Sequence, residues 1–114
     1  MKKRFKGNYL DAVPMIINED WKYNENKLIV IDVVNRGFFN YIARRFFNRP
    51  GVSHIMLDLY GSSVWKYIDG NNTVFDIISF MQEDYPKEGQ DMMVRVVLFI
   101  KKLQTCRFIE IKSE

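Results

Sequence analysis

The side chains that most often carry out chemistry are sparse in this chain. It has one histidine, His54, and one cysteine, Cys106. A lone cysteine cannot form an internal disulfide, and one cysteine with one histidine is too few for a Cys/His zinc site. Cys106 also has no histidine or acid close by in the sequence to form a nucleophilic pair. We therefore expect no catalytic residue and no metal site.

The carboxylates of the central segment are better explained by helix ends than by catalysis. Asp69-Gly70 is typical of the left-handed turn that ends a helix, and Thr73 followed by Asp76 is a variant of the capping box that begins one. The two helices are joined so tightly that they form a helix-turn-helix, which can serve DNA, a peptide or only the core. The sequence contains no paired-carboxylate site or Gly-rich phosphate loop, so an enzyme is the least favoured class and no cofactor is expected.

Hydrophobic periodicity predicts the elements around this turn. Strands are expected at 21–23, 28–34, 52–57 and 108–111, and helices from Asp58 to about 68, 74 to about 85, and about 90 to 105. This order predicts an α+β, winged helix-turn-helix-like fold, in which a three-stranded N-terminal antiparallel sheet precedes a three-helix bundle. The whole chain, 1–114, is expected to be one domain, with a basic N-terminal arm at 1–18 and an aromatic insertion at 35–51.

Composition limits the location and the partners. No apolar run approaches the 18 residues of a membrane span, and no apolar signal core follows the charged residues 1–7. We therefore expect a cytoplasmic protein that does not enter membranes. The net charge of +3 permits an acidic partner, but the excess lies mostly in 1–7 and between Arg36 and Arg49, which argues only weakly for nucleic acid.

The last helix is apolar over more than one face. Its expected core stripe is Met93, Val96, Val97, Ile100 and Leu103. Met92 and Phe99 extend one flank, and Val94 and Leu98 extend the other. Either the hairpin or the aromatic segment 38–47 covers both flanks, or one flank lines a groove for a partner peptide.

Two further hypotheses use other surfaces. A winged-helix DNA-binding regulator would use Arg95, Lys101 and Lys102, although Asp91 in the first turn of that helix opposes phosphate. Nucleic acid is therefore the less favoured partner. Alternatively, the aromatic segment 38–47 could form a homodimer.

A longer motif supports the peptide hypothesis. It runs from Leu57 through Trp65-Lys66-Tyr67-Ile68-Asp69-Gly70 to Thr73-Val74 and Ile77, with Val97, Leu103 and Phe108-Ile109 following. Over about 52–111 the chain resembles the PqqD-like family, which is named for a pyrroloquinoline quinone biosynthesis protein. The sequence departs from the family pattern in the insertion at 35–51, and at Cys106-Arg107, where a glycine turn often closes the last helix.

The resemblance implies a function in natural product biosynthesis. Members of the family are recognition elements, or peptide chaperones, for ribosomally made and modified peptides. They bind the leader of a precursor peptide as an added β-strand between the third strand and the third helix, and deliver it to a tailoring enzyme, often a radical SAM protein. Carried over to this chain, the implied peptide-binding residues are Ser53, His54, Ile55 and Met56 on the strand and Met92, Arg95, Phe99 and Lys102 on the helix.

Overall fold

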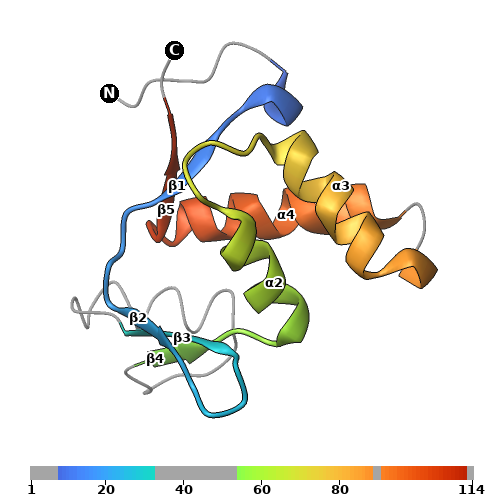
Figure 1. The fold of residues 1–114 in the computed structure, drawn as a ribbon. Coiled ribbons are helices and arrows are strands. Elements are labelled where there is room, and N and C mark those ends of the chain that lie inside the picture. The colour runs from blue at the N-terminus through green and yellow to red at the C-terminus, as the bar shows by residue number, and fades with distance from the viewer. Residues whose placement is uncertain (1–7, 33–53, 89–90, 113–114) are drawn as a thin grey trace. The chain divides into compact units, whose positions relative to one another are not determined.

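Two small antiparallel sheets and three α-helices form the part of the chain that this computed structural model describes, residues 8–32, 54–88 and 91–112 (Figure 1). These elements confirm the predicted α+β class. The chain divides into two compact units. We call residues 19–62 the sheet unit, and residues 1–18 together with 63–114 the helical unit. The predicted insertion 35–51 lies outside the described residues.

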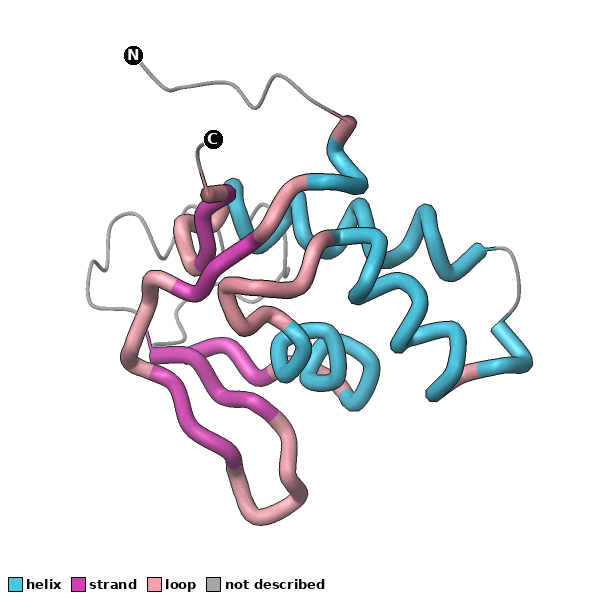
Figure 2. The backbone as a smooth tube through the Cα atoms, turned by 45° about the horizontal axis from the view of Figure 1, so that its top comes forward, coloured by secondary structure: helices cyan, strands magenta, loops and turns pink. Residues whose placement is uncertain are grey.

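The sheet unit is built on three strands in the order β2-β3-β4, with β2 at Trp21–Tyr23, β3 at Ile29–Asp32 and β4 at His54–Met56 (Figure 2). All three had been expected: β2 has the predicted bounds, whereas β3 and β4 are shorter than predicted. Successive side chains alternate between the two faces of the sheet. Ile31 lies opposite both Trp21 and Ile55 on the buried face, whereas Val30 lies opposite Lys22 and Met56 on the other.

Helix α2, Leu59–Tyr67, begins in the sheet unit and ends in the helical unit. Asp58 caps its first turn, as predicted, because its Oδ1 accepts a hydrogen bond from the Gly61 amide at 2.7 Å. Four side chains of the predicted helix, spaced at helical intervals in the sequence, were expected to face inward; Val64, Trp65 and Ile68 are buried, whereas Tyr60 is half-buried.

The turn between α2 and α3 has the predicted geometry. Gly70 has φ +81°, and the Asp69 carboxylate accepts the Asn72 amide at 2.8 Å, which holds the pKa of Asp69 below its usual value. Thr73 and Asp76 form a reciprocal capping box at the start of α3, Val74–Asp84, with N···O distances of 2.9 and 3.0 Å. Helix α3 buries Val74, Ile77, Ile78 and Met81, whose spacing of i, i+3, i+4 and i+7 in the sequence predicts this buried face.

The N-terminal segment contains two elements that the sequence did not predict. A 3₁₀ helix, η1, spans Tyr9–Asp11, and strand β1, Pro14–Ile16, pairs antiparallel with the predicted closing strand β5, Ile109–Ile111 (Figure 1). The carbonyl of Ala12 accepts the Val74 amide at 2.9 Å, so this segment satisfies a backbone donor at the start of α3 that would otherwise have no partner.

Helix α4, Asp91–Thr105, packs against α3 and β5, and its buried stripe is Met92, Val96, Ile100 and Leu103. The expected stripe was wrong at Met93, which is 42% exposed, and Val97 is only half-buried. Methionine occupies both 92 and 93, and valine occupies both 96 and 97. The helix therefore has two adjacent apolar stripes, and hydrophobic periodicity alone does not show which of them is buried. Of the two alternatives left open for the flanks of this helix, covering of both flanks does not hold, because Val94 and Leu98 are exposed.

Helix α4 ends in a Schellman motif. The Phe108 amide donates to the Leu103 carbonyl at 3.1 Å, and the Arg107 amide donates to the Gln104 carbonyl at 3.0 Å. Arg107 takes the left-handed position, with φ +63°, where glycine is the usual residue. A residue with a Cβ is strained there by roughly 1 kcal/mol.

Replacing Thr73 by alanine should lower the free energy of unfolding by about 1 kcal/mol, because the Asp76 amide loses its cap acceptor. Ser79→Ala is the matched control, since that hydroxyl bonds only to the Phe75 carbonyl within the same helix. Urea unfolding measures both variants. Equal losses would contradict a stabilising cap.

Arg107→Gly should raise the free energy of unfolding by about 0.5–1 kcal/mol, because glycine adopts positive φ without strain. Gly70→Ala should lower the free energy of unfolding, because alanine is strained at a φ of +81°. Steric clash is not the cause, since an added Cβ meets only ordinary contacts with the Lys112 side chain at 3.9 Å. Thermal unfolding of the two variants side by side checks the signs. A destabilising Arg107→Gly would contradict the strain argument.

Candidate functional site

Strand β4 pairs with β3 on one side, and no other described strand pairs with its outer side. Backbone groups in an antiparallel ladder alternate between facing the partner strand and facing away. The Leu57 amide donates to the Ile29 carbonyl at 2.8 Å, so the next hydrogen-bonded pair along the ladder is Ile55 with Ile31. The amides and carbonyls of His54 and Met56 therefore face the outer edge of the sheet.

The hydroxyl of Ser62 ends this ladder. Its Oγ accepts the Ile29 amide at 2.9 Å and donates to the Leu57 carbonyl at 3.3 Å. The hydroxyl thus takes the place of the second, reciprocal hydrogen bond of this pair, from the Ile29 amide to the Leu57 carbonyl. Because Ser62 lies in the first turns of α2 and is buried, it ties the start of that helix to the ends of β3 and β4.

The side chains of β4 alternate like its backbone. Ile55 is buried among the core residues of the sheet, whereas His54 and Met56 are exposed on the opposite face. The Sδ atom of Met56 accepts a hydrogen bond from Asn24 Nδ2 at 3.3 Å, so this exposed side chain is supported by the β2–β3 turn. Ser53, the fourth residue expected on this strand, lies outside the described residues.

The four residues expected on the helix differ in their accessibility. Met92 has no exposed surface, Arg95 is exposed, and Phe99 and Lys102 are half-buried. Arg95, Phe99 and Lys102 share one side of α4, because they are spaced four and three residues apart. Met92 instead belongs to the core. The residues expected on the strand thus belong to the sheet unit, and the residues expected on the helix belong to the helical unit.

Two further features of the helical unit involve residues outside the set expected to bind the peptide. Arg95 Nη1 forms an ion pair with Glu88 Oε2 at 2.7 Å. Val94 and Leu98, at 58% and 62% exposure, place apolar side chains on the outer side of α4. Their spacing of four residues was visible in the sequence, whereas the ion pair joins residues seven positions apart across a turn and had no sequence signal.

Cys106 and Tyr67 both have pKa values well above neutral pH. Burial raises the pKa of the Cys106 thiol to about 11, so the thiol is protonated near neutral pH. The hydrogen bond from Tyr67 to Asp84, 2.6 Å long, raises the pKa of Tyr67 to about 12. Residues 8–32, 54–88 and 91–112 contain no cluster of His, Cys, Asp and Glu able to hold a metal ion.

Comparison with known proteins decides the family. The model of the family described as Coenzyme PQQ synthesis protein D (PqqD) matches residues 48–109, more than half of the chain. The chain belongs to the PqqD family. No curated protein and no solved structure matches it.

The match to the PqqD family covers β4, α2, α3 and α4, and ends at the first residue of β5. Both sets of expected peptide-binding residues therefore lie within the part of this PqqD protein that matches its family. Strands β1, β2 and β3 precede the matched region, although β3 supplies the ladder that orients the backbone of β4.

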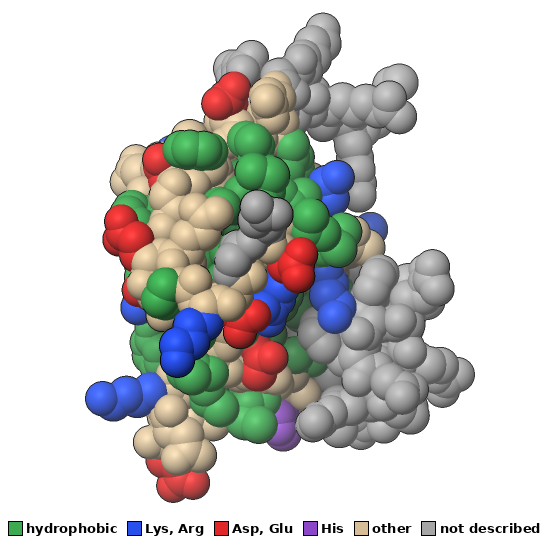
Figure 3. Space-filling model, turned by 90° about the vertical axis from the view of Figure 1, so that its right-hand side faces the viewer, with side chains coloured by type: hydrophobic (Ala, Val, Ile, Leu, Met, Phe, Trp, Pro, Cys, Tyr) green, Lys and Arg blue, Asp and Glu red, His purple; other side chains and the backbone are tan. Residues whose placement is uncertain are grey.

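The cations of a DNA-reading surface are partly engaged in this PqqD protein. Arg95 is paired with Glu88, and the Nζ atom of Lys101 lies over the Tyr9 ring, 5.1 Å from its centroid. On the face drawn in Figure 3, the described Lys and Arg side chains are interspersed with acidic ones and form no single basic patch. No described helix is both long and apolar enough to span a bilayer.

Ser62→Ala should lower the free energy of unfolding by about 1–3 kcal/mol, because the Ile29 amide and the Leu57 carbonyl lose their buried partner. Thr105→Ala is the control, since the Thr105 hydroxyl bonds to the Lys101 carbonyl at the exposed end of α4. Chemical unfolding gives both values, and a loss under 0.5 kcal/mol for Ser62→Ala would refute the bridging role.

Proposed function

We propose that this protein is a non-catalytic adaptor that captures the leader of a ribosomally made precursor peptide and presents it to a separate modifying enzyme. Membership of the PqqD family supports a role in the biosynthesis of pyrroloquinoline quinone or another modified peptide, with a peptide and a biosynthetic enzyme as partners. The observation that carries the proposal is the outer edge of β4, where His54 and Met56 turn their backbone groups away from β3.

A peptide strand that pairs with this edge gains up to four backbone hydrogen bonds, an amide and a carbonyl from each of these two residues. At roughly 0.5–1.5 kcal/mol net for each bond, they contribute about 2–6 kcal/mol. Micromolar affinity needs about 8 kcal/mol, beyond the cost of ordering the peptide. Strand addition alone is therefore too weak, and side-chain contacts must supply the rest.

We assign these side-chain contacts to α4. Arg95 and Lys102 suit carboxylates of the leader, and Phe99 suits an apolar side chain. Met92, which has no exposed surface, supports this side of the helix from within the core rather than touching the peptide. On the strand, Ile55 faces the core, so the exposed side chains of His54 and Met56 are the described groups available to the leader; Ser53 stays a proposed contact from the family resemblance.

The partner enzyme in this proposal is a tailoring enzyme of the radical SAM class, and the setting is the cytoplasm, where precursor peptides are synthesised. Family membership supports an enzyme partner. The protein itself would need no cofactor, because its task is to raise the local concentration of the leader at the enzyme.

Met56→Pro should weaken peptide binding about tenfold relative to Met56→Ala. Both variants remove the thioether and its contact with Asn24, but only proline removes an outward amide. The binding probe is the set of short peptides encoded beside the gene, labelled with a fluorophore and followed by anisotropy. Circular dichroism confirms that both variants are folded.

Equal affinity of the two variants would refute strand addition at β4. Duplex DNA is the competing ligand in the same assay. DNA binding that weakens steeply with salt, without peptide binding, would instead identify a winged-helix regulator.

A further inference from the structure

Arg95 already has a carboxylate partner within its own chain. The Oε2 atom of Glu88 lies 2.7 Å from Nη1 of Arg95, and the two side chains remain 48% and 42% exposed. Arg95 is also one of the three α4 side chains that the proposed function assigns to the leader peptide. The guanidinium of Arg95 therefore pairs with Glu88 of its own chain, and the proposed function also requires it to pair with a carboxylate of the leader peptide.

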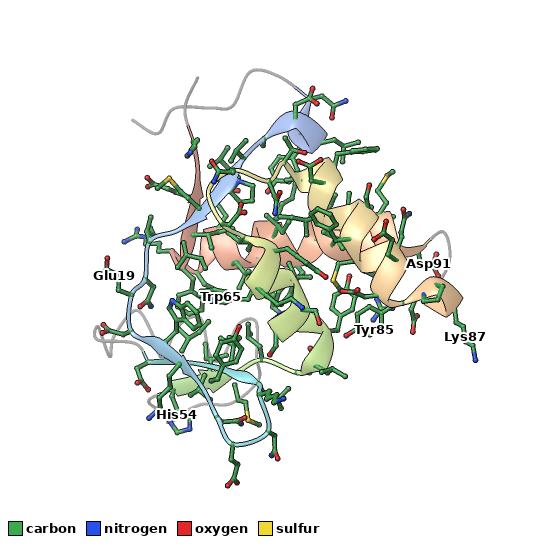
Figure 4. The ribbon with its side chains drawn as sticks, viewed as in Figure 1. Glu19, His54, Trp65, Tyr85, Lys87 and Asp91 are labelled. Atoms are coloured by element: carbon green, nitrogen blue, oxygen red, sulfur yellow. The ribbon has the colours of Figure 1, made fainter. Side chains whose placement is uncertain are left out.

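The backbone that carries Glu88 is anchored in the helical unit. Glu88 ends the short 3₁₀ helix η3, Pro86–Glu88, and its amide donates to the Tyr85 carbonyl at 3.1 Å. Tyr85 is held in turn, because its amide donates to the Met81 carbonyl at 2.9 Å and its hydroxyl lies 3.1 Å from Ser63 Oγ. Figure 4 places Tyr85, Lys87 and Asp91 at the same end of α3 and α4.

An anchored carboxylate on a flexible side chain acts as a tethered ligand with a high local concentration. An exposed ion pair is nevertheless weak, so water and other carboxylates can displace it without unfolding the helix. The arrangement suits exchange rather than permanent pairing. A permanent structural pair would be expected to be buried, whereas both side chains of this pair remain substantially exposed.

We propose that Glu88 is a built-in competitor that occupies Arg95 until a side-chain carboxylate of the bound peptide replaces it. This inference rests on the proposed function and deepens it, because it specifies a glutamate or aspartate of the peptide as the group that Arg95 recognises. Glu88 thereby lowers affinity for acidic peptides and disfavours peptides without an acid at that position.

The test is a double-mutant cycle with Glu88→Gln, Arg95→Gln and the double variant, titrated with the neighbouring-gene peptides and with a hexaglutamate peptide. All peptides are C-terminally amidated, so that only side-chain carboxylates can bind Arg95. Glu88→Gln should tighten binding about two- to fivefold at low salt, the range expected from the loss of one exposed ion pair. On the Arg95→Gln background the same change should have no effect.

Glu83→Gln is the matched control, because it removes one exposed acidic charge from the nearby end of α3 and has no ion pair in the described structure. Equal tightening by Glu83→Gln would overturn the proposal in favour of a general charge effect. Weaker binding by Glu88→Gln would also overturn it, since Glu88 would then position Arg95 for the peptide.

The proposed function can fail separately. If the neighbouring-gene peptides bind neither the native protein nor Glu88→Gln, the leader is not the ligand. The hexaglutamate titration, followed through the side-chain NεH signal of Arg95, still decides whether Glu88 competes with external carboxylates. An Arg95 signal that responds equally in native protein and Glu88→Gln refutes the competitor.

Discussion

The hydroxyl of Ser62 fixes the relation between β3, β4 and the start of α2, because it stands between the Ile29 amide and the Leu57 carbonyl. Since the side-chain and backbone directions of a strand repeat every two residues, a slip of one residue would turn Ile55 outward and the amide of Met56 inward. The same register buries Ile55 against the sheet core and exposes the edge that the proposed function uses. The register of β3 and β4 and the proposed peptide-binding edge are therefore both stabilised by one buried hydroxyl.

The α4 side chains that we propose for peptide binding lie on a frame that is also held by several contacts. Helix α4 is held on one side by α3 and at its end by β5, and β5 depends on β1 for its pairing. The carbonyl of Ala12 completes the start of α3. The N-terminal segment thus stabilises the helix that carries Arg95, although it precedes the region shared with the PqqD family.

The sequence predicted the parts of the fold that local chemistry determines. Thr73, Asp76 and Gly70 act through neighbouring backbone atoms, so their types and spacing were sufficient. Strand β1 was missed because its partner lies almost at the other end of the chain, and three residues that begin with proline carry no periodic signal. The buried face of α4 was predicted one residue away from its true position, at Met93, because only packing against α3 and β5 determines which of two adjacent apolar stripes is buried. Of the expected site, the strand and helix were predictable as elements, but the Glu88 ion pair and the burial of Met92 required the structure.

Amide hydrogen exchange along β4, measured with and without a saturating neighbouring-gene peptide, tests strand addition most directly. The account predicts new protection at His54 and Met56, whose amides face outward, and little change at Ile55, whose amide faces β3. Such an alternating pattern is expected only if a strand pairs with this edge. Protection gained at Trp21 and Tyr23 on the opposite edge of the sheet, or no gain at His54 and Met56 while the peptide is bound, would contradict the account.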